Sequence, residues 1–320
     1  MRDGFSLTRA PNPHLERGRQ IVRAHPEVKR YFCTYPPTAL WIVAVVAVQL
    51  WMAFALRQAG WLWVLLAAYL VGAFASHALF VLIHDAGHNL IFRRSTPNRV
   101  FGILCNVGQG FPTAMSFRVF HALHHSHLDE YDFDGDLPFH REARMVGVSP
   151  WRKAVWLLLF PFIELVRPVR IRRAFVDRWI LANAIVIAAT DAAIAYLWGP
   201  KALAYVILST VFGVGFHVVG ARWVQEHFIF REGQETYSYY GPLNWLAFNI
   251  GYHNEHHDLV RVPWVYLPKV RALAPEFYDG LYAHRSWTRV LLRFLFDDGI
   301  DLYTRIARER PFDERPASAA

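Results

Sequence analysis

The sequence predicts an all-α integral membrane protein, with four transmembrane helices in two hairpins and a cytoplasmic helical cap. Of its 320 residues, 54% are hydrophobic and only 19% are charged, a balance that argues against a simple soluble protein. Four stretches hold about 20 mostly apolar residues each, enough to cross a hydrocarbon core about 30 Å thick. The longer polar segments are rich in arginine, which indicates that they share one side of the membrane.

Short turns join the apolar stretches in pairs. The four predicted spans are Thr38–Leu56, Trp61–Ile83, Trp179–Trp198 and Ala202–Ala221. Four residues separate the first two and a Gly-Pro-Lys turn separates the last two, so each pair predicts a tight helical hairpin. Two shorter apolar runs, Val100–Phe111 and Val155–Val166, are too brief to span and are expected at the interface or beneath the polar part.

The distribution of basic residues predicts the orientation. The turns within the hairpins carry one basic residue each, whereas the N-terminal segment holds seven and the stretch from Arg93 to Arg173 holds twelve. The positive-inside rule therefore puts both termini and the middle loop in the cytoplasm. The expected segments are an N-terminal segment (1–37), hairpin 1 (38–83), a middle loop (84–178), hairpin 2 (179–221) and a C-terminal region (222–320), forming one catalytic unit.

The net charge of +8 is better explained by a membrane surface than by nucleic acid, because the arginines flank apolar stretches. Thirty of the 34 basic residues are arginine, which favours a bacterial inner membrane; in a eukaryote we would expect the endoplasmic reticulum. No short apolar segment with a cleavage site opens the chain, so we expect no signal peptide.

Eight of the sixteen histidines form three clusters, each close to the cytoplasmic end of a predicted span. They are His84 and His88, then His121, His124 and His125, then His253, His256 and His257. Residues three and four apart share a helix face, so each cluster can direct imidazoles toward one point. At this histidine frequency about 0.04 H-x-x-H-H motifs are expected by chance, and two are present.

The number of histidines indicates which metal they bind. Eight neutral imidazoles exceed the three or four ligands of a zinc site, and Cys33 and Cys105 are too few for a cysteine-based site. The Glu-x-x-His pattern of carboxylate-bridged di-iron proteins is missing from the clusters. Two histidine-bound irons are therefore predicted, able to react with dioxygen and to oxidise an unactivated C–H bond of a lipid.

The remaining histidines leave alternatives open. His227 lies beyond the last span, and its position favours neither a ligand role nor another one. For His77 and His217 three interpretations stay open: metal ligand, neighbour of the site, or packing residue. The isolated His14, His25, His140 and His284 are expected to be ordinary core or surface residues. Asp191 is the one acid within a predicted span, too far from the cytoplasmic end for direct catalysis. A metal transporter is the remote alternative; it would instead place histidines and paired acids along its spans.

Three longer motifs carry a resemblance that covers nearly the whole chain. They are the segment from Glu235 to Asn244, the segment from Asn249 to Asp258, and Pro13-His14 followed by the segment from His25 to Lys29. With Phe296-Asp297-Asp298 and Tyr303, they make the sequence resemble the membrane fatty acid desaturase and hydroxylase superfamily, and most closely its sphingolipid Δ4-desaturases.

The resemblance implies a non-haem di-iron site with nine histidines, which raises His227 to a ligand. These are His84, His88, His121, His124, His125, His227, His253, His256 and His257. Other motif residues are candidates for orienting ligands or contacting substrate: His77, Asp85, Asn89, Asp134, Asp136, Asn254, Glu255 and Asp258. For Asp134 and Asp136, a solvated acidic loop is an equally good interpretation.

The implied reaction removes two hydrogens from the sphingoid base of a dihydroceramide-like lipid, using O₂ and electrons from an outside donor. Cytochrome b5 or ferredoxin, each with its reductase, would supply the electrons, and the apolar chain would lie in a tunnel leading to the irons. The chain departs from the family at Asp85, where Glu is usual, at Arg222, where His is frequent, and in the second histidine cluster. Hydroxylation of the same lipid and desaturation of an acyl chain therefore stay open.

Overall fold

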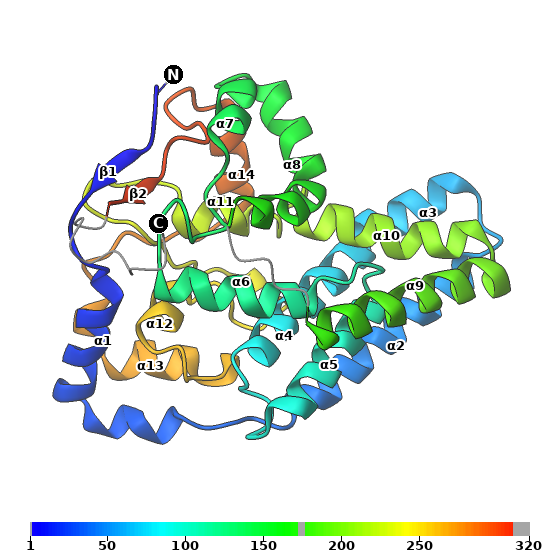
Figure 1. The fold of residues 1–320 in the computed structure, drawn as a ribbon, viewed down its shortest axis with the longest axis horizontal. Helices are drawn as coiled ribbons and strands as arrows, with labels where there is room; N and C mark the ends of the chain where they lie inside the picture. The colour runs from blue at the N-terminus through cyan, green and yellow to red at the C-terminus, as the bar shows by residue number, and fades with distance from the viewer. Residues whose placement is uncertain (1, 172–176, 310–320) are drawn as a thin grey trace.

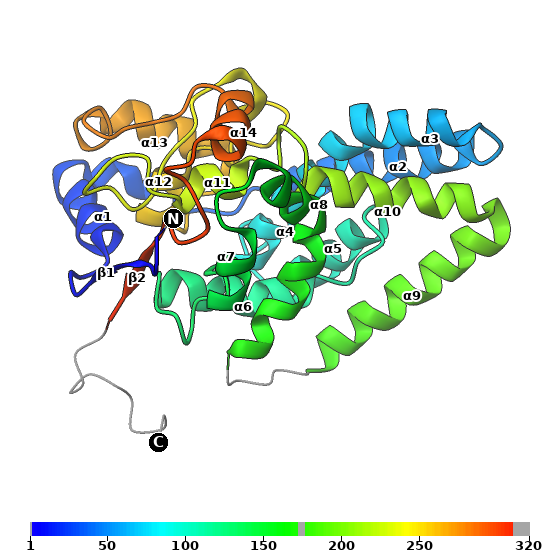
Figure 2. The same ribbon diagram turned by 90° about the horizontal axis from the view of Figure 1, so that it is seen from above.

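The computed structural model describes residues 2–171 and 177–309, and most of its regular structure is helical (Figure 1). Figures 1 and 2 show a long arm made of α2, α3, α9 and α10 extending to one side of the molecule. The shorter elements gather at the other end, which we call the cap: α1, α6 to α8 and α11 to α14. Arg172, Arg173 and residues 310–320 of the predicted polar segments lie outside the described residues.

Three helices are long and apolar enough to cross a membrane, in agreement with the first three predicted spans. They are α2 (Thr38–Leu56), the continuous helix Trp61–Gly87 and α9 (Arg178–Trp198). The second consists of α3 (Trp61–Ala67), a π-helical turn η2 (Ala68–Gly72) and α4 (Ala73–Gly87). Only 22% of α2 and 17% of α9 is buried within the protein, so their apolar side chains face outward, as lipid contact requires.

The fourth predicted span, Ala202–Ala221, was wrong in length. Helix α10 (Pro200–Val214) has 15 residues, or about 22 Å, and ends at Gly215. The chain then folds back through bends and turns, where a Cβ on Gly220 would lie 1.9 Å from the Gly215 carbonyl oxygen. Val214, Val219 and Ala221 are buried in the protein core, so apolar composition there reflects protein packing and not lipid.

Helix α10 packs closely against α4. A Cβ on Gly213 would lie only 2.3 Å from the carbonyl oxygen of Ala73, so the two backbones touch at a position that only glycine allows. Nearby, the hydroxyl groups of Ser76 and Thr210 lie 2.5 Å apart, and Gln109 Nε2 donates to the Ser76 carbonyl at 3.0 Å. These bonds satisfy polar groups between apolar helices.

The rest of the chain builds the cap and its connections to the arm. Its helices are α1 (Pro13–Ala24), α5 (Ser95–Val107), α6 (Ala114–Ser126), α7 (His140–Val146), α8 (Pro150–Val166), α11 (Arg222–His227), α12 (His253–Asp258), α13 (Leu267–Leu273) and α14 (Trp287–Phe296). The 3₁₀ segments are η1 (Pro26–Tyr31), η3 (Arg167–Arg170), η4 (Pro242–Asn244), η5 (Trp264–Tyr266) and η6 (Pro275–Phe277). Neither α5 nor α8, which hold the two shorter apolar runs, reaches spanning length, as predicted.

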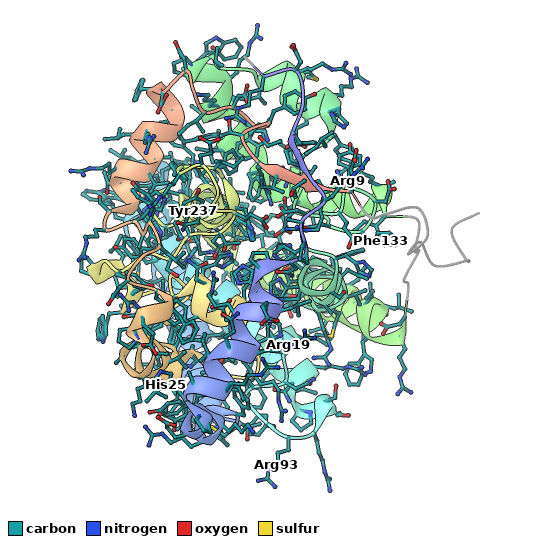
Figure 3. The ribbon with its side chains drawn as sticks, turned by 90° about the vertical axis from the view of Figure 1, so that its left-hand side faces the viewer. Arg9, Arg19, His25, Arg93, Phe133 and Tyr237 are labelled. Atoms are coloured by element: carbon teal, nitrogen blue, oxygen red, sulfur yellow. The ribbon has the colours of Figure 1, made fainter. Side chains whose placement is uncertain are left out.

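The described fold is mostly helical, as predicted, with one short pair of strands besides. Strand β1 (Ser6–Thr8) pairs in parallel with β2 (Ile306–Arg308), joining the two ends of the chain. Three residues are too few to show the alternation of a strand in sequence. Figure 3 shows the cap from its outer side, with α1 across it and the exposed side chains of Arg19 and Arg93 projecting.

Candidate metal centre

Four helices bring the predicted ligands together. His84 lies in the last turn of α4 and His88 directly follows that helix, while α6 carries His121, His124 and His125. Helix α12 carries the third cluster, and α11 ends at His227. Figure 1 shows α6, α11 and α12 gathered beside the cap end of α4.

Local hydrogen bonds explain why these helices begin and end where they do. The Asn106 side chain accepts the backbone N–H of Ala114 at 2.8 Å and so caps the start of α6. The Ser238 hydroxyl oxygen accepts the N–H of Asn254 at 3.0 Å near the start of α12. After α4, Asn89 adopts the left-handed conformation at φ 58°, which turns the chain away.

The first group of nitrogens comes from all three sequence clusters. Its members, whose ligand atoms all lie within 4.8 Å of one another, are His84, His88, His121, His125 and His256. His256 Nε2 lies 2.9 Å from His84 Nε2 and 3.0 Å from His125 Nε2. His125 Nε2 lies 3.0 Å from His121 Nε2.

The second group adjoins the first. It contains His124, His227 and His257, again within 4.8 Å of one another, and His253 Nε2 lies 3.0 Å from His227 Nε2. The rings of His125 and His257 connect the groups, with centroids 4.4 Å apart. All nine histidines expected as ligands therefore lie in one continuous cluster.

The spacing of these nitrogens fits metal ligation better than hydrogen bonding. Two nitrogens bound at right angles, each about 2.1 Å from one ion, lie about 3.0 Å apart. A neutral imidazole nitrogen either donates one proton or offers one lone pair, so His256 Nε2 cannot satisfy two Nε2 neighbours by hydrogen bonding. Buried His88 Nε2 and His257 Nε2 have no hydrogen-bond partner within residues 2–171 and 177–309. The donor set could hold two ions, one in each group.

The protonation of the cluster suits metal binding. Burial, together with neighbouring positive charge, lowers the pKa of most of these imidazoles well below its usual range. This holds for His121, His125, His227, His253, His256 and His257. Burial, then the charge of Arg118, lowers the pKa of His88 to about 4. These rings are neutral at pH 7, and their lone pairs are available to an ion.

His124 is the exception, because a carboxylate holds it. Burial disfavours its charge, but Asp134 and Asp136 outweigh burial and raise the pKa of His124 to about 9. Both Asp134 oxygens lie 3.0 Å from His124 Nδ1. The same oxygens accept the backbone N–H groups of Asp129 at 2.8 Å and Asp136 at 2.9 Å. Asp134 is thus fixed in place and holds one proton on Nδ1, so that Nε2 is the nitrogen that would give up its proton to bind an ion.

Asp136 also lies near this ring, with its Oδ2 3.4 Å from His124 Nδ1. His124, Asp134 and Asp136 could form a third metal-binding group by distance alone. Asp134 already uses both oxygens for backbone N–H groups, however, so we assign it to orienting His124. The structure favours this role over a solvated acidic loop for Asp134, which is fully buried.

Two other candidate neighbours of the site, Glu255 and Asp85, bond to segments outside the ligand helices. Glu255 accepts hydrogen bonds from the hydroxyl groups of Ser238 at 2.7 Å and Tyr240 at 2.6 Å, which anchor α12. Asp85 accepts a long hydrogen bond from the Trp264 N–H at 3.5 Å. These bonds support the helices that carry the ligands, and Asp85 Oδ1 also lies 3.9 Å from Nδ1 of His84 in the first nitrogen group.

Asn254 and Asp258 connect α12 to the N-terminal helix. Asp258 lies 2.6 Å from His14 Nδ1 and 2.7 Å from Arg17 Nε, and Arg17 Nη2 donates to Asn254 at 3.2 Å. The His14 ring is buried, with its centroid 4.9 Å from that of His257. His14 is therefore a core residue, but one that packs directly on the predicted ligands.

His77 and His217 lie outside the nitrogen groups. His77 Nδ1 is 3.1 Å from the Gly213 carbonyl oxygen, between α4 and α10. The His217 ring packs on Tyr69 and Phe74, with centroids 4.7 and 4.8 Å away. Both positions match the packing alternative.

Sequence reasoning missed a charged pair on α11. Arg222 Nη1 donates to Glu226 Oε1 at 2.6 Å, and the same oxygen lies 3.4 Å from His253 Nδ1. Both side chains are buried. The sequence did hold a signal for this pair: Arg222 and Glu226 are four residues apart, directly before His227, which is the spacing of an ion pair on one helix face. Here Arg222 holds the carboxylate that faces a predicted ligand.

A cavity of about 170 Å³ opens beside the first nitrogen group. Its walls come from α4, α6, α8, α10 and α11, and it reaches His121. Most of the lining is apolar, including Phe80, Phe117 and Trp223. An elongated apolar ligand in this cavity would lie next to the histidines.

Comparison with known proteins agrees with this geometry. Residues 59–289 match the family model described as fatty acid desaturase. A sphingolipid delta(4)-desaturase DES1-like protein of Oryza sativa subsp. japonica is 39% identical over 97% of this chain and 94% of its own length. Sphingolipid delta(4)-desaturase DES1 of Drosophila melanogaster is 38% identical, covering 97% of both chains.

A third relative carries a second activity in its name. Sphingolipid delta(4)-desaturase/C4-monooxygenase DES2 of Rattus norvegicus is 38% identical over 96% of both chains. The family match covers well over half of the sequence, and these relatives align from end to end. This chain therefore belongs to the fatty acid desaturase family.

Proposed function

We propose that this chain is a membrane desaturase that introduces a double bond into the sphingoid backbone of a dihydroceramide-like lipid. The observation that carries the proposal is the pair of adjoining nitrogen groups beside an apolar cavity. One iron would be held by His84, His88, His121, His125 and His256. The other would be held by His124, His227, His253 and His257. The names and end-to-end similarity of the relatives support the lipid class.

The reaction takes two hydrogens from adjacent carbons of the lipid. One O₂, two electrons and two protons are consumed, and the two lipid hydrogens leave with the oxygen as two molecules of water. The irons supply the redox chemistry with O₂ that imidazoles alone cannot provide. The electrons come from a separate protein, cytochrome b5 or ferredoxin with a reductase.

The chain itself binds and orients the reactants. Phe80, Phe117 and Trp223 hold the apolar lipid chain beside His121 and exclude water from it. Asp134 keeps the proton of His124 on Nδ1, and Glu226, held by Arg222, faces the Nδ1 of His253. These carboxylates fix the ring orientations that a metal site needs.

The proposed membrane arrangement keeps both termini and the metal centre on the cytoplasmic side, with α10 as a short fourth crossing. The helix Trp61–Gly87 is about 40 Å long, so its last turn, with His84, extends past a hydrocarbon core of about 30 Å. Basic residues crowd the polar segments at this end. The segments 1–37, 38–83, 84–178, 179–221 and 222–320 would then act as one catalytic unit, in a bacterial inner membrane.

Hydroxylation is the second candidate, because relatives are named both desaturase and C4-monooxygenase. Desaturation of a fatty acyl chain would use the same centre. A transporter is disfavoured, because the nine histidines gather at one end of the helices and do not line the spans.

Lipid analysis of a host that makes the protein tests the proposal. We expect an unsaturated sphingoid base, about two irons per purified chain, and loss of both the product and about one iron in the variant His257→Ala. Product mass separates a double bond from an added hydroxyl group. Turnover that survives His257→Ala, or a purified active protein without iron, would refute the mechanism.

A further inference from the structure

The cavity has a polar region next to the metal centre that the desaturase chemistry does not use. Among its mostly aromatic and aliphatic lining are two carboxylates, Asp136 and Glu164. Asp136 lies beside His124, at 3.4 Å from its Nδ1, and His121 lines the same cavity. The carboxylates therefore lie where a ligand is close to the reacting position.

Both carboxylates have unused hydrogen-bonding capacity. Glu164 is bound through Oε1 to Arg167 Nη1 at 2.5 Å, and its second oxygen has no partner within the described residues. In the described part of the chain, the nearest hydrogen-bond or ion-pair partner of the Asp136 carboxylate is His124 Nδ1, at 3.4 Å. The Glu164 and Asp136 side chains are 25% and 29% exposed, and both line the cavity.

A hydrogen-bond donor lines the same cavity. Trp223 lines the cavity, and its buried indole N–H has no acceptor within residues 2–171 and 177–309. A buried donor without a partner is costly, and a bound acceptor such as a carbonyl oxygen would satisfy it. The polar region thus combines two acceptors with one donor.

The position of the reaction demands such a region. In a desaturation between C4 and C5 of a sphingoid base, the C3 hydroxyl and the C2 amide lie within about 4 Å of C4, because each bond adds about 1.5 Å. A lipid placed with C4 at the irons must therefore bury its O–H, N–H and carbonyl groups beside them. An acyl chain that reacts far from its head group carries no polar group at this depth.

We propose that Asp136 and Glu164 form the subsite for the polar head of the sphingoid substrate, accepting hydrogen bonds from its hydroxyl and amide N–H groups, with Trp223 donating to the amide carbonyl. The assignment rests on the proposed function and specifies which lipid the same site selects. Two carboxylates favour a neutral, hydroxylated head group and repel a phosphorylated one or an acyl thioester with phosphates. Two cations adjoin these carboxylates: Arg167 is paired with Glu142 and Glu164, and Arg305 donates to the Asp136 carbonyl at 2.7 Å and lies 3.6 Å from Asp129.

A pair of matched variants tests the subsite. Glu142 and Glu164 both bind Arg167, at 2.7 and 2.5 Å, but only Glu164 lines the cavity. Glu164→Gln and Glu142→Gln would be compared on dihydroceramide and on its 3-deoxy analogue. We expect the native preference in kcat/KM for the hydroxylated lipid to shrink about tenfold or more in Glu164→Gln and to persist in Glu142→Gln. Asp136→Asn should shrink it as well, with its iron content measured alongside.

Equilibrium binding of the two lipids to the same purified proteins separates this inference from the proposed function. If the native protein oxidises neither lipid but binds the hydroxylated one more tightly through Glu164, the proposed function fails and the subsite stands. If Glu164→Gln keeps the native preference in both binding and turnover, the subsite is overturned. An equal loss of preference in Glu142→Gln would also overturn it, because Arg167 and not the cavity wall would then carry the effect.

Discussion

Replacing Asp134 by asparagine tests whether one buried carboxylate controls the second iron position. The substitution keeps the shape of the side chain but replaces one oxygen by an NH₂ group. One Asp134 oxygen accepts the backbone N–H of Asp129 and the other accepts the backbone N–H of Asp136. In either orientation of the asparagine amide, its NH₂ group therefore faces one of these two N–H donors. One hydrogen bond to a charged acceptor is lost, at a cost of about 1.5–3 kcal/mol in folding stability.

The larger effect falls on metal binding. Without the carboxylate, burial dominates the environment of His124 and its pKa falls from about 9. The ring also loses the partner that holds its proton on Nδ1. Removing such a partner weakens metal binding by about 10–100-fold, or roughly 1.4–2.7 kcal/mol. We therefore expect Asp134→Asn to fold, to keep the iron of the first nitrogen group and to lose that of the second.

Iron content measured after dialysis against a graded chelator series provides the assay, with product formation as the second readout. Asp132→Asn is the matched control, because Asp132 lies two residues away and is exposed. If Asp134→Asn retained both irons at the same chelator concentration as the native protein, Asp134 would not orient a metal ligand. Equal losses in both variants would point to a general effect of charge in this loop.

The remaining predictions concern packing, the α11 pair and pH. Gly213→Ala should destabilise the protein by about 1–3 kcal/mol in thermal unfolding, because its Cβ meets the Ala73 carbonyl at 2.3 Å, whereas Gly280→Ala, with nothing within 4 Å, should not. Glu226→Gln should weaken iron retention by about tenfold, since the carboxylate facing His253 is lost, and unchanged retention in the chelator assay would contradict that role. The hydrogen bond between His25 and Glu276 raises the pKa of His25 and lowers the pKa of Glu276. This bond therefore stabilises the fold fully at a pH that lies above the unfolded pKa of Glu276 and below the unfolded pKa of His25. We expect hydrogen-exchange protection in η1, measured relative to the intrinsic exchange rate, to fall as pH rises through the raised His25 pKa in the native protein but not in Glu276→Gln.

The histidine clusters were predictable from sequence because their spacing is local. Three or four residues along a helix bring side chains to one face whatever the rest of the protein does, so His121 and His125 had to lie together. The first three spans were predictable for a similar reason, since length and apolar composition alone determine whether a helix can cross a bilayer. Whether the clusters meet depends on how α4, α6, α11 and α12 pack together, which spacing within one helix does not determine.

Contacts between segments that are distant in sequence could not be predicted from spacing within one helix. Residues 215–221 are as apolar as a membrane helix, but they fold under the cap, because an apolar side chain is satisfied equally by lipid and by protein. The pairing of β1 with β2 joins residues about 300 positions apart, and no local pattern encodes it. Asp258 was expected near the metal, but its partners, His14 and Arg17, come from the opposite end of the chain.

The sequence by itself therefore indicated the membrane class and eight of the nine predicted ligands, since these depend on composition and on spacing within single helices, while the family and His227 rested on the resemblance of the longer motifs. Only the tertiary structure decided which nitrogens lie in one group, that Glu226, held by Arg222, faces His253, and that Glu164 of α8 lines the cavity with His121 of α6. These relations depend on how separate helices pack, and packing is set by contacts between residues that are remote in sequence.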